Sequence, residues 1–154
     1  MRSGTENLPG IAGFAQAARL ACGSREAHYA HVVKLNGIFR KILREEIRSC
    51  VLLSAEDVCS PYILNVAFPG LRAEVVQHSV EMKGVYLSVG SACSSHKKDR
   101  SQTLLAMGVD PRVIDGAVRI SFSYQNTEEE AEYAAKVICA EVKKLYGRRK
   151  GIRA

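Results

Sequence analysis

The stretch AVRISFS, residues 117–123, decides the class of fold. Apolar and polar side chains alternate along it, with Val118, Ile120 and Phe122 against Arg119, Ser121 and Ser123. Alternation with a period of two is typical of a strand that buries one face and exposes the other. We therefore expect a sheet with one covered side, and the pattern by itself favours an Arg119 that points outward to solvent.

Three other segments have the composition of short strands: residues 50–53, 63–68 and 85–89. Pro69-Gly70 ends the second of them. Apolar periodicity predicts helices as well, over residues 8–21, 25–47, 71–82, 101–107 and 127–146. The order of these elements predicts an α+β fold, in which a small, mostly antiparallel sheet has helices over one face.

Start and stop signals support the helix assignments. Asn7 is the expected N-cap of the first helix, with Pro9 in its first turn. Gly23-Ser24 is expected to separate the first helix from the second. Thr127 and Glu130 have the spacing of a capping box at the start of the last helix.

The bulk composition is that of an ordinary globular domain. The chain has 154 residues, of which 47% are apolar and 25% charged, enough for one domain with a hydrophobic core. No apolar run approaches the roughly 18–20 residues that a membrane helix needs, and the first residues lack the layout of a signal peptide. We expect a soluble, cytoplasmic protein with no membrane association.

The net charge of +6 comes largely from two stretches, residues 40–48 and the tail at 148–154. Neither stretch interleaves aromatic residues with its basic ones, and neither carries a nucleic-acid-binding motif. We therefore expect no nucleic-acid partner.

The five cysteines form no C-x-x-C pair, and their odd number argues against a disulfide framework. We expect no metal site. Cys22, Cys50 and Cys139 lie in apolar stretches and are expected to be structural thiols. Cys59 lies in a polar stretch and is expected to be exposed or half exposed.

Cys93 has different surroundings, in the stretch VGSACSSHKK, residues 89–98. Its small neighbours offer nothing to pack against, while His96, Lys97 and Lys98 bring positive charge. Cations beside a thiol favour the thiolate, which is the nucleophilic form. The residues alone leave two interpretations open, a reactive nucleophile and a loop cysteine without a role.

The stretch GSACSS, residues 90–95, resembles the nucleophile loop of cysteine desulfurases, pyridoxal-phosphate enzymes of the class V aminotransferase family. Residues 1–17 resemble the segment that follows the cofactor lysine in these enzymes. Residues 60–95 resemble their small domain up to the loop, and residues 118–130 resemble the strand and turn beyond it. The resemblance runs from residue 1 to about residue 145, in family order, and is to the C-terminal part of the enzyme.

This resemblance implies the small C-terminal domain of a fold-type I pyridoxal-phosphate enzyme. Residues 1–23 are then a junction segment and helix from the large domain, and residues 24–147 the small domain. Residues 148–154 are a basic tail, which we expect to fray because it lies at the end of the chain. Without the large domain, the helix over residues 8–21 exposes part of an apolar face. We expect self-association or a mobile N-terminus as the consequence.

The resemblance also implies an activity. Desulfurases remove sulfur from L-cysteine, giving L-alanine and a persulfide that passes to a sulfur-acceptor or scaffold protein for iron-sulfur cluster or other thio-cofactor assembly. Cys93 matches the nucleophile, and Arg119 matches the arginine that grips the substrate carboxylate. Thr5 matches a threonine that contacts the cofactor phosphate of the other subunit in a homodimer.

One part of the family pattern is missing. The cofactor lysine of these enzymes lies in a Ser-x-His-Lys block followed by a Gly-rich turn, and that combination does not occur here. We therefore expect that the chain does not bind pyridoxal phosphate covalently and is incomplete alone, the large domain being on another chain or missing. The alternative is a non-catalytic sulfur-carrier or protein-interaction module that retains the small-domain fold.

Three further positions carry expectations. Asn65 is either structural or adjacent to the substrate, and the sequence leaves both open. His78, on a predicted helix among apolar residues, is expected to be a core or boundary histidine. Asp99-Arg100 stands where relatives often have a proline that starts the next helix, and the difference is expected to loosen the far end of the Cys93 loop.

Overall fold

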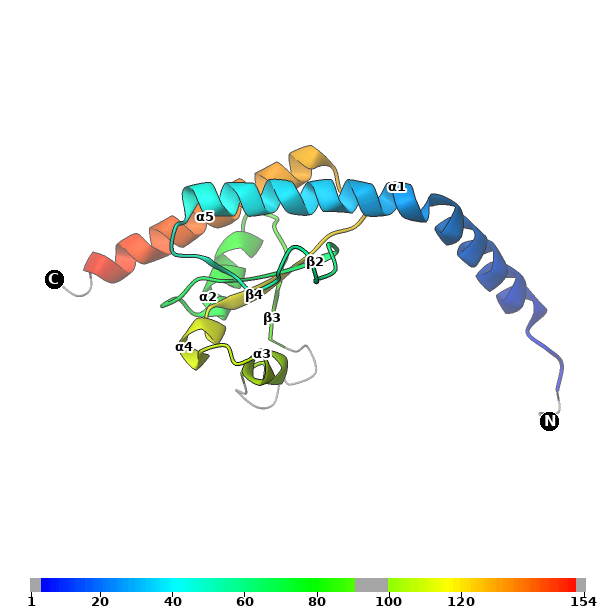
Figure 1. Cartoon of the computed structure of the whole chain (residues 1–154), viewed down its shortest axis with the longest axis horizontal. Coiled ribbons are helices and arrows are strands. Elements are labelled where there is room, and N and C mark those ends of the chain that lie inside the picture. Colours follow the sequence, from blue (N-terminus) through cyan, green and yellow to red (C-terminus); the bar gives the residue numbers. More distant parts are fainter. Residues whose placement is uncertain (1–3, 91–99, 152–154) are drawn as a thin grey trace.

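The computed structural model of the chain describes residues 4–90 and 100–151 (Figure 1). Its elements in chain order are α1 (Leu8–Glu46), β1 (Val51–Leu52), β2 (Ile63–Ala67), α2 (Ala73–Glu81), β3 (Ser88–Val89), α3 (Gln102–Ala106), α4 (Pro111–Ile114), β4 (Ala117–Ser121) and α5 (Glu128–Gly151). The chain combines five helices with four strands in the residues described, and because every strand pair is antiparallel the expected α+β class is confirmed.

The four strands form one antiparallel sheet in the order β1-β2-β4-β3. β4, which contains most of AVRISFS, pairs with β2 on one side and with β3 on the other. The register sets Leu64 opposite Ile120 and Val66 opposite Val118, so the apolar residues of both strands share one face. The small antiparallel sheet expected from the order of the elements is confirmed, as is the half-buried strand expected from the alternating pattern.

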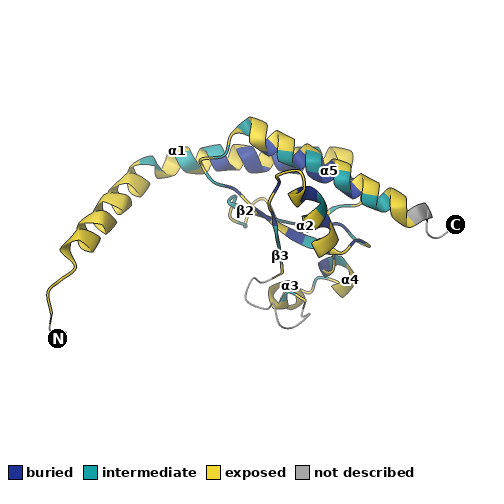
Figure 2. Cartoon of the chain, turned by 180° about the vertical axis from the view of Figure 1, so that it is seen from behind, coloured by how far each residue is buried: buried dark blue, intermediate teal, exposed yellow. Residues whose placement is uncertain are grey.

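Helices α1, α2 and α5 cover this apolar face (Figures 1 and 2). A single hydrophobic core joins them to the sheet. Its largest fully buried side chains come from the sheet and from the helices alike: Val32, Leu35, Leu43, Leu64, Val66, Phe68, Val76, Val80, Val118, Ile138 and Val142. Burial of these side chains is the main stabilising contribution, because each removes apolar surface from water.

The capping signals are confirmed at both long helices. Asn7 Oδ1 accepts a hydrogen bond from the Gly10 N–H at 3.1 Å. Thr127 and Glu130 bond reciprocally: the Glu130 N–H donates to Thr127 Oγ1 and the Thr127 N–H donates to Glu130 Oε2, both at 3.2 Å. Each bond satisfies a backbone donor that a helix start would otherwise leave without a partner.

Helix α1 is continuous over 39 residues, so the expected break at Gly23-Ser24 is wrong. A glycine inside a helix costs only about 1 kcal/mol relative to alanine, which is too little to end a long helix. The Ser24 hydroxyl donates to the Leu20 carbonyl at 2.8 Å, a bond that bends helices without breaking them. Figure 1 shows such a bend in the blue N-terminal part of α1.

Helix α5 continues to Gly151, beyond the expected end near residue 146. The Tyr146 hydroxyl donates to the Pro69 carbonyl at 3.1 Å, and the Arg149 guanidinium donates to the Gly70 carbonyl. These bonds hold the end of α5 against the turn after β2. The part of the basic tail that lies before residue 152 is therefore helical, which corrects the expectation that it frays.

The N-terminal third of α1 makes no contribution to the core. Every described residue from Gly4 to Gly23 is exposed, whereas Val32, the first buried residue of the helix, is fully covered (Figure 2). Phe14 has the largest exposed fraction of the apolar side chains there, at 78%. The expectation of an exposed apolar face on this helix is confirmed. In the described parts of the chain, no helix has the length and apolarity to span a bilayer.

Two phenylalanines on α1 test this division of the helix. Phe39 is 2% exposed and packs edge-on against Phe122 with ring centroids 5.3 Å apart. Phe39→Ala is expected to lower the free energy of unfolding by about 3–5 kcal/mol. The matched variant Phe14→Ala is expected to change it by less than about 0.5 kcal/mol. Urea unfolding followed by far-UV circular dichroism measures both, and equal losses would contradict the assignment of Phe14 to a surface outside the core.

Candidate functional site

Arg119 lies in the middle of β4, on the sheet face turned away from α1, α2 and α5, and we call this face the open face because the Arg119 side chain is exposed there. The register places Asn65 of β2 directly opposite it on one side and Ser88 of β3 directly opposite it on the other. Residues that pair across antiparallel strands point to the same face. We refer to Asn65, Arg119 and Ser88 as the polar row.

Arg119 has no acidic partner within residues 4–90 and 100–151, because none of the nine ion pairs found there includes it. Its side chain is exposed, as the alternating pattern predicts. A guanidinium can donate two parallel hydrogen bonds to a carboxylate. The Arg119 guanidinium, held on a strand of the sheet, can therefore bind an anionic ligand at the open face.

The chain leaves β3 close to this row. Ser88 pairs with Arg119, and only Val89 and Gly90 separate Ser88 from the segment that contains Cys93. Gly90 has a φ of +62°, a conformation that glycine adopts without strain. Cys93 and His96 themselves lie outside the described residues. The structure thus places the strand that leads to Cys93 beside Arg119, and sequence order ties the thiol to that strand.

Arg100, the first described residue after this segment, forms a bidentate ion pair. Arg100 donates from Nε and Nη2 to the two carboxylate oxygens of Asp115, at 2.6 and 3.0 Å. Hydrogen bonding from Arg100 lowers the pKa of Asp115 below its usual value. Arg100 thus has a bidentate partner in Asp115, whereas Asp99 and the loop before it lie outside the described residues, so the expectation that Asp99-Arg100 loosens the far end of the loop stays a prediction.

Thr5 lies far from the polar row within this chain. It is exposed and precedes α1, whose first buried residue is Val32. With a rise of 1.5 Å per residue, the helix from Leu8 to Val32 is about 36 Å long. Figure 1 shows the N-terminus projecting away from the sheet accordingly. The chain itself therefore does not bring Thr5 and Arg119 into one site.

Two of the other sequence expectations need correction. His78 is exposed, because the buried face of α2 is formed by Ala73, Val76 and Val80 instead. Its Nδ1 lies 3.5 Å from the Glu81 Oε2. Cys22 is exposed, because the part of α1 that carries it packs against nothing in the described chain.

The remaining described thiols behave as expected. Cys139 is buried, and desolvation raises the pKa of its thiol to about 11. Desolvation also raises the pKa of the partly buried Cys50. Cys59 is partly buried, in agreement with its polar loop. Within residues 4–90 and 100–151, no three metal-ligating side chains come together.

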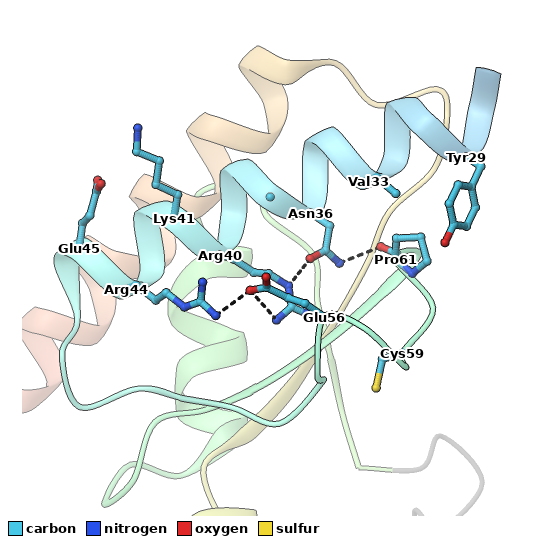
Figure 3. Close-up of a pocket in the computed structure, with 11 residues that line it drawn as sticks. Tyr29, Val33, Asn36, Arg40, Lys41, Arg44, Glu45, Glu56, Cys59 and Pro61 are labelled. Carbon is cyan, nitrogen blue, oxygen red and sulfur yellow. Dashed lines mark hydrogen bonds and ion pairs between the residues drawn. The ribbon is translucent and has the colours of Figure 1, made fainter. Parts of the chain in front are cut away.

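The sequence did not indicate a cavity of about 430 Å³ between α1 and the loop before β2 (Figure 3). Arg40 lies against it, nearly buried, and donates from Nε to Asn36 Oδ1 at 2.5 Å. The Asn36 amide donates to the Pro61 carbonyl at 2.8 Å, and Glu56 pairs with Arg44 at 2.6 Å. Arg40 also lies 3.7 Å from Glu56. These polar groups satisfy one another, so the cluster fastens the loop to α1.

Comparison with known proteins places the chain in a family. The model of the family described as aminotransferase class-V matches residues 1–133. A cysteine desulfurase of Sinorhizobium fredii is 36% identical over 144 residues, which are 94% of this chain and 37% of the relative. A putative cysteine desulfurase of Bacillus subtilis, named IscS 1, is 34% identical over 145 residues, 94% of this chain and 38% of the relative.

A solved structure agrees with these relatives. A NifS-like protein superposes with a TM-score of 0.76 at 32% sequence identity, over 92% of this chain and 35% of its own. The chain therefore spans less than two fifths of the proteins that it matches. Since the family pattern covers most of the chain and the fold agrees with it, the chain belongs to the class-V aminotransferase family.

Proposed function

We propose that this chain is the part of a pyridoxal-phosphate-dependent cysteine desulfurase that grips the substrate and receives its sulfur. The position of Arg119 carries the proposal: it lies on the open sheet face, beside the strand that leads to Cys93. The similarity to cysteine desulfurases over 94% of the chain supports the same activity. The proposed substrate is L-cysteine, and the proposed products are L-alanine and a Cys93 persulfide.

The proposed division of labour follows from the residues present. Arg119 holds the substrate carboxylate through two hydrogen bonds and so fixes the orientation of the amino acid. The Cys93 thiolate attacks the substrate sulfur, a sulfur–sulfur bond forms and the carbon–sulfur bond breaks. The electron pair of that bond stays with the substrate carbon, which takes up a proton to give alanine. The persulfide then passes to an acceptor or scaffold protein, in iron-sulfur cluster or other thio-cofactor assembly.

We propose that this chain supplies only some of the contacts to pyridoxal phosphate. When bound, the cofactor acts as an electron sink that makes the substrate's bonds easier to break. Four of the nine lysines in the sequence form ion pairs with carboxylates on the surface: Lys34, Lys136, Lys143 and Lys144. We propose that Thr5 contributes a contact to the cofactor phosphate, across a homodimer in the cytoplasm. The remaining cofactor contacts come from residues outside this sequence.

The exposed apolar part of α1 supports a role for such residues. Leu8, Ile11 and Phe14 recur at three-residue spacing and are each more than half exposed. Matched relatives extend well beyond the part that this chain spans. We propose that the rest of the fold covers this stripe.

Amide hydrogen exchange tests whether the rest of the fold covers the exposed apolar residues of α1. In the chain alone, amides of residues 8–20 are expected to exchange much faster than those of residues 32–43, which pack in the core. Adding a polypeptide that carries the rest of a relative's fold is expected to slow exchange in residues 8–20 and leave residues 32–43 unchanged. Protection of residues 8–20 in the chain alone, at a concentration where it is monomeric, would contradict the proposal.

Reconstitution tests the activity. The chain is mixed with the same polypeptide, pyridoxal phosphate, L-cysteine and a reductant, and sulfide and alanine are measured. Cys93→Ser is expected to abolish sulfide release, whereas the control Cys22→Ser, at an exposed thiol remote from the sheet, is expected to leave it unchanged.

In the same assay, Arg119→Lys keeps the positive charge but loses the two parallel N–H donors of the guanidinium, and is expected to lower kcat/KM about 10–100-fold. Its control is Arg112→Lys, at an exposed arginine of α4. Full activity of Cys93→Ser, or none with any such polypeptide, would overturn the proposal.

Thiol alkylation tests the special reactivity of Cys93 independently of turnover. At neutral pH Cys93 is expected to react first, and Cys139 last, because a buried thiol with a pKa of about 11 remains protonated. Unfolding the chain is expected to bring Cys139 up to the rate of the others, because it exposes the thiol and removes the desolvation that raises its pKa. Peptide mass mapping over time measures the order. A Cys93 that is no faster than the exposed Cys22 would count against a reactive role.

A further inference from the structure

We infer that Asn65 is a second carboxylate-binding residue, whose side-chain amide donates to the same carboxylate that Arg119 holds. The inference rests on the proposed function only for the identity of the ligand, an α-amino acid. The site itself is formed by residues of this chain. Four observations carry it: the pairing geometry of β2 and β4, the unused amide of Asn65, the charge of the open face, and the residue type.

The backbone of Asn65 shows how close its side chain lies to Arg119. The Asn65 N–H donates to Ser54 Oγ, and the Asn65 carbonyl accepts from the Leu53 N–H, both at 2.9 Å. Both backbone groups of Asn65 therefore point toward β1 and away from β4. The pair Asn65 and Arg119 is consequently a non-hydrogen-bonded pair, in which the two Cα atoms are only about 4.5 Å apart.

The neighbouring pairs follow the same alternation. The Phe122 N–H donates to the Tyr62 carbonyl at 2.8 Å, so the hydrogen-bonded positions between β2 and β4 fall at Tyr62, Leu64 and Val66. Asn65 falls between two of them. In such a narrow pair the side chains are closer than at a hydrogen-bonded position. A ligand group that Arg119 holds therefore lies within reach of the Asn65 amide.

The side-chain amide of Asn65 has no competing task in the described structure. Its own backbone groups are satisfied by Ser54 and Leu53, and no hydrogen bond to its amide is formed within residues 4–90 and 100–151. A carboxylate has about four lone-pair sites, and a guanidinium fork uses two. The Asn65 amide can fill a third, and the Ser88 hydroxyl lies on the other side of Arg119 to fill a fourth.

The charge of the open face favours an anion. The paired positions on that face are Val51, Ile63, Asn65, Ala67, Ser88, Ala117, Arg119 and Ser121. Arg119 is the only charged residue among them, so no carboxylate on these strands competes for it. Ala67 is fully buried and Ala117 is half-buried, so the ends of β2 and β4 that carry them are covered, whereas Arg119 and Ser121 are exposed. The ligand class that this surface suits is a small carboxylate.

The residue type is unusual for its place. Asparagine is disfavoured in strands, and Asn65 lies in the middle of one whose other residues are Ile63, Leu64, Val66 and Ala67. A local preference that is broken without a structural gain is typical of a functional position. The Asn65 side-chain amide forms no hydrogen bond with the rest of the described chain, whereas it could donate one to a bound carboxylate.

The test measures carboxylate binding to the whole chain, without cofactor and without turnover. The ¹⁵N-labelled chain is titrated with L-alanine, and with L-alaninamide as the probe that lacks the carboxylate. The Arg119 Nε–H and the Asn65 side-chain amide resonances are expected to shift in a saturable way with L-alanine only. Absence of a saturable shift at either group overturns the inference.

Four variants separate Asn65 from its surroundings. Asn65→Ala is expected to weaken L-alanine binding roughly tenfold, the loss of one hydrogen bond to a charged group. Asn65→Ser, which retains a donor, is expected to recover part of that loss. Asn65→Asp places a carboxylate beside Arg119 and is expected to abolish binding and to shift the Arg119 Nε–H in the absence of ligand. Ser121→Ala, on the same face of β4, is the matched control and is expected to bind as the parent does.

Each outcome has one meaning. Far-UV circular dichroism identifies any variant that fails to fold, in which case Asn65→Ser, the mildest change, decides. Binding of L-alanine by Asn65→Ala with parental affinity overturns the inference and leaves the proposed function standing. Loss of binding in the Asn65 variants, with no sulfide from any reconstituted assembly, supports the inference and overturns the proposed function.

Discussion

The antiparallel pairing of β2 with β4 sets both the core and the candidate site. The register that places Leu64 opposite Ile120 on the helix-covered face also places Asn65 opposite Arg119 on the open face. Because side chains alternate along a strand, a slip of one residue would move the apolar set to solvent and the polar pair into the core. The free-energy cost of such a slip fixes the register, and the register fixes Asn65 opposite Arg119. The precision of the polar row is therefore a consequence of core packing.

The parts of the structure that were predictable from sequence depend on local chemistry. The alternation in residues 117–123 predicted an exposed Arg119 on a half-buried strand, and the register confirms it. Asn7, Thr127 and Glu130 predicted helix starts, because capping bonds join residues within one turn. Asp110-Pro111 carried a similar signal for α4, which the sequence analysis missed. The site residue Asn65 could be located on its strand, but its neighbour across the sheet depends on a register that local patterns do not give.

The wrong predictions have a common physical origin in tertiary packing. Cys22 has apolar neighbours in sequence but no packing partner in the described chain, and His78 lies on the outer face of a helix whose inner face is apolar. Arg40 belongs to the basic stretch at residues 40–48, yet it is nearly buried, because a loop 16 residues or more along the chain supplies Glu56 and Pro61 to the same cluster. The residues next to a position in the sequence do not show which distant segment packs against it in the fold.

The central claim is that Arg119 and Asn65 together orient the substrate for sulfur transfer to Cys93. A crystal structure of the reconstituted assembly with L-cysteine bound tests it most directly. The account predicts that the substrate carboxylate lies within hydrogen-bonding distance of both the Arg119 guanidinium and the Asn65 amide, with the substrate sulfur turned toward the segment that carries Cys93. A carboxylate bound elsewhere, with Arg119 facing solvent, would contradict the account.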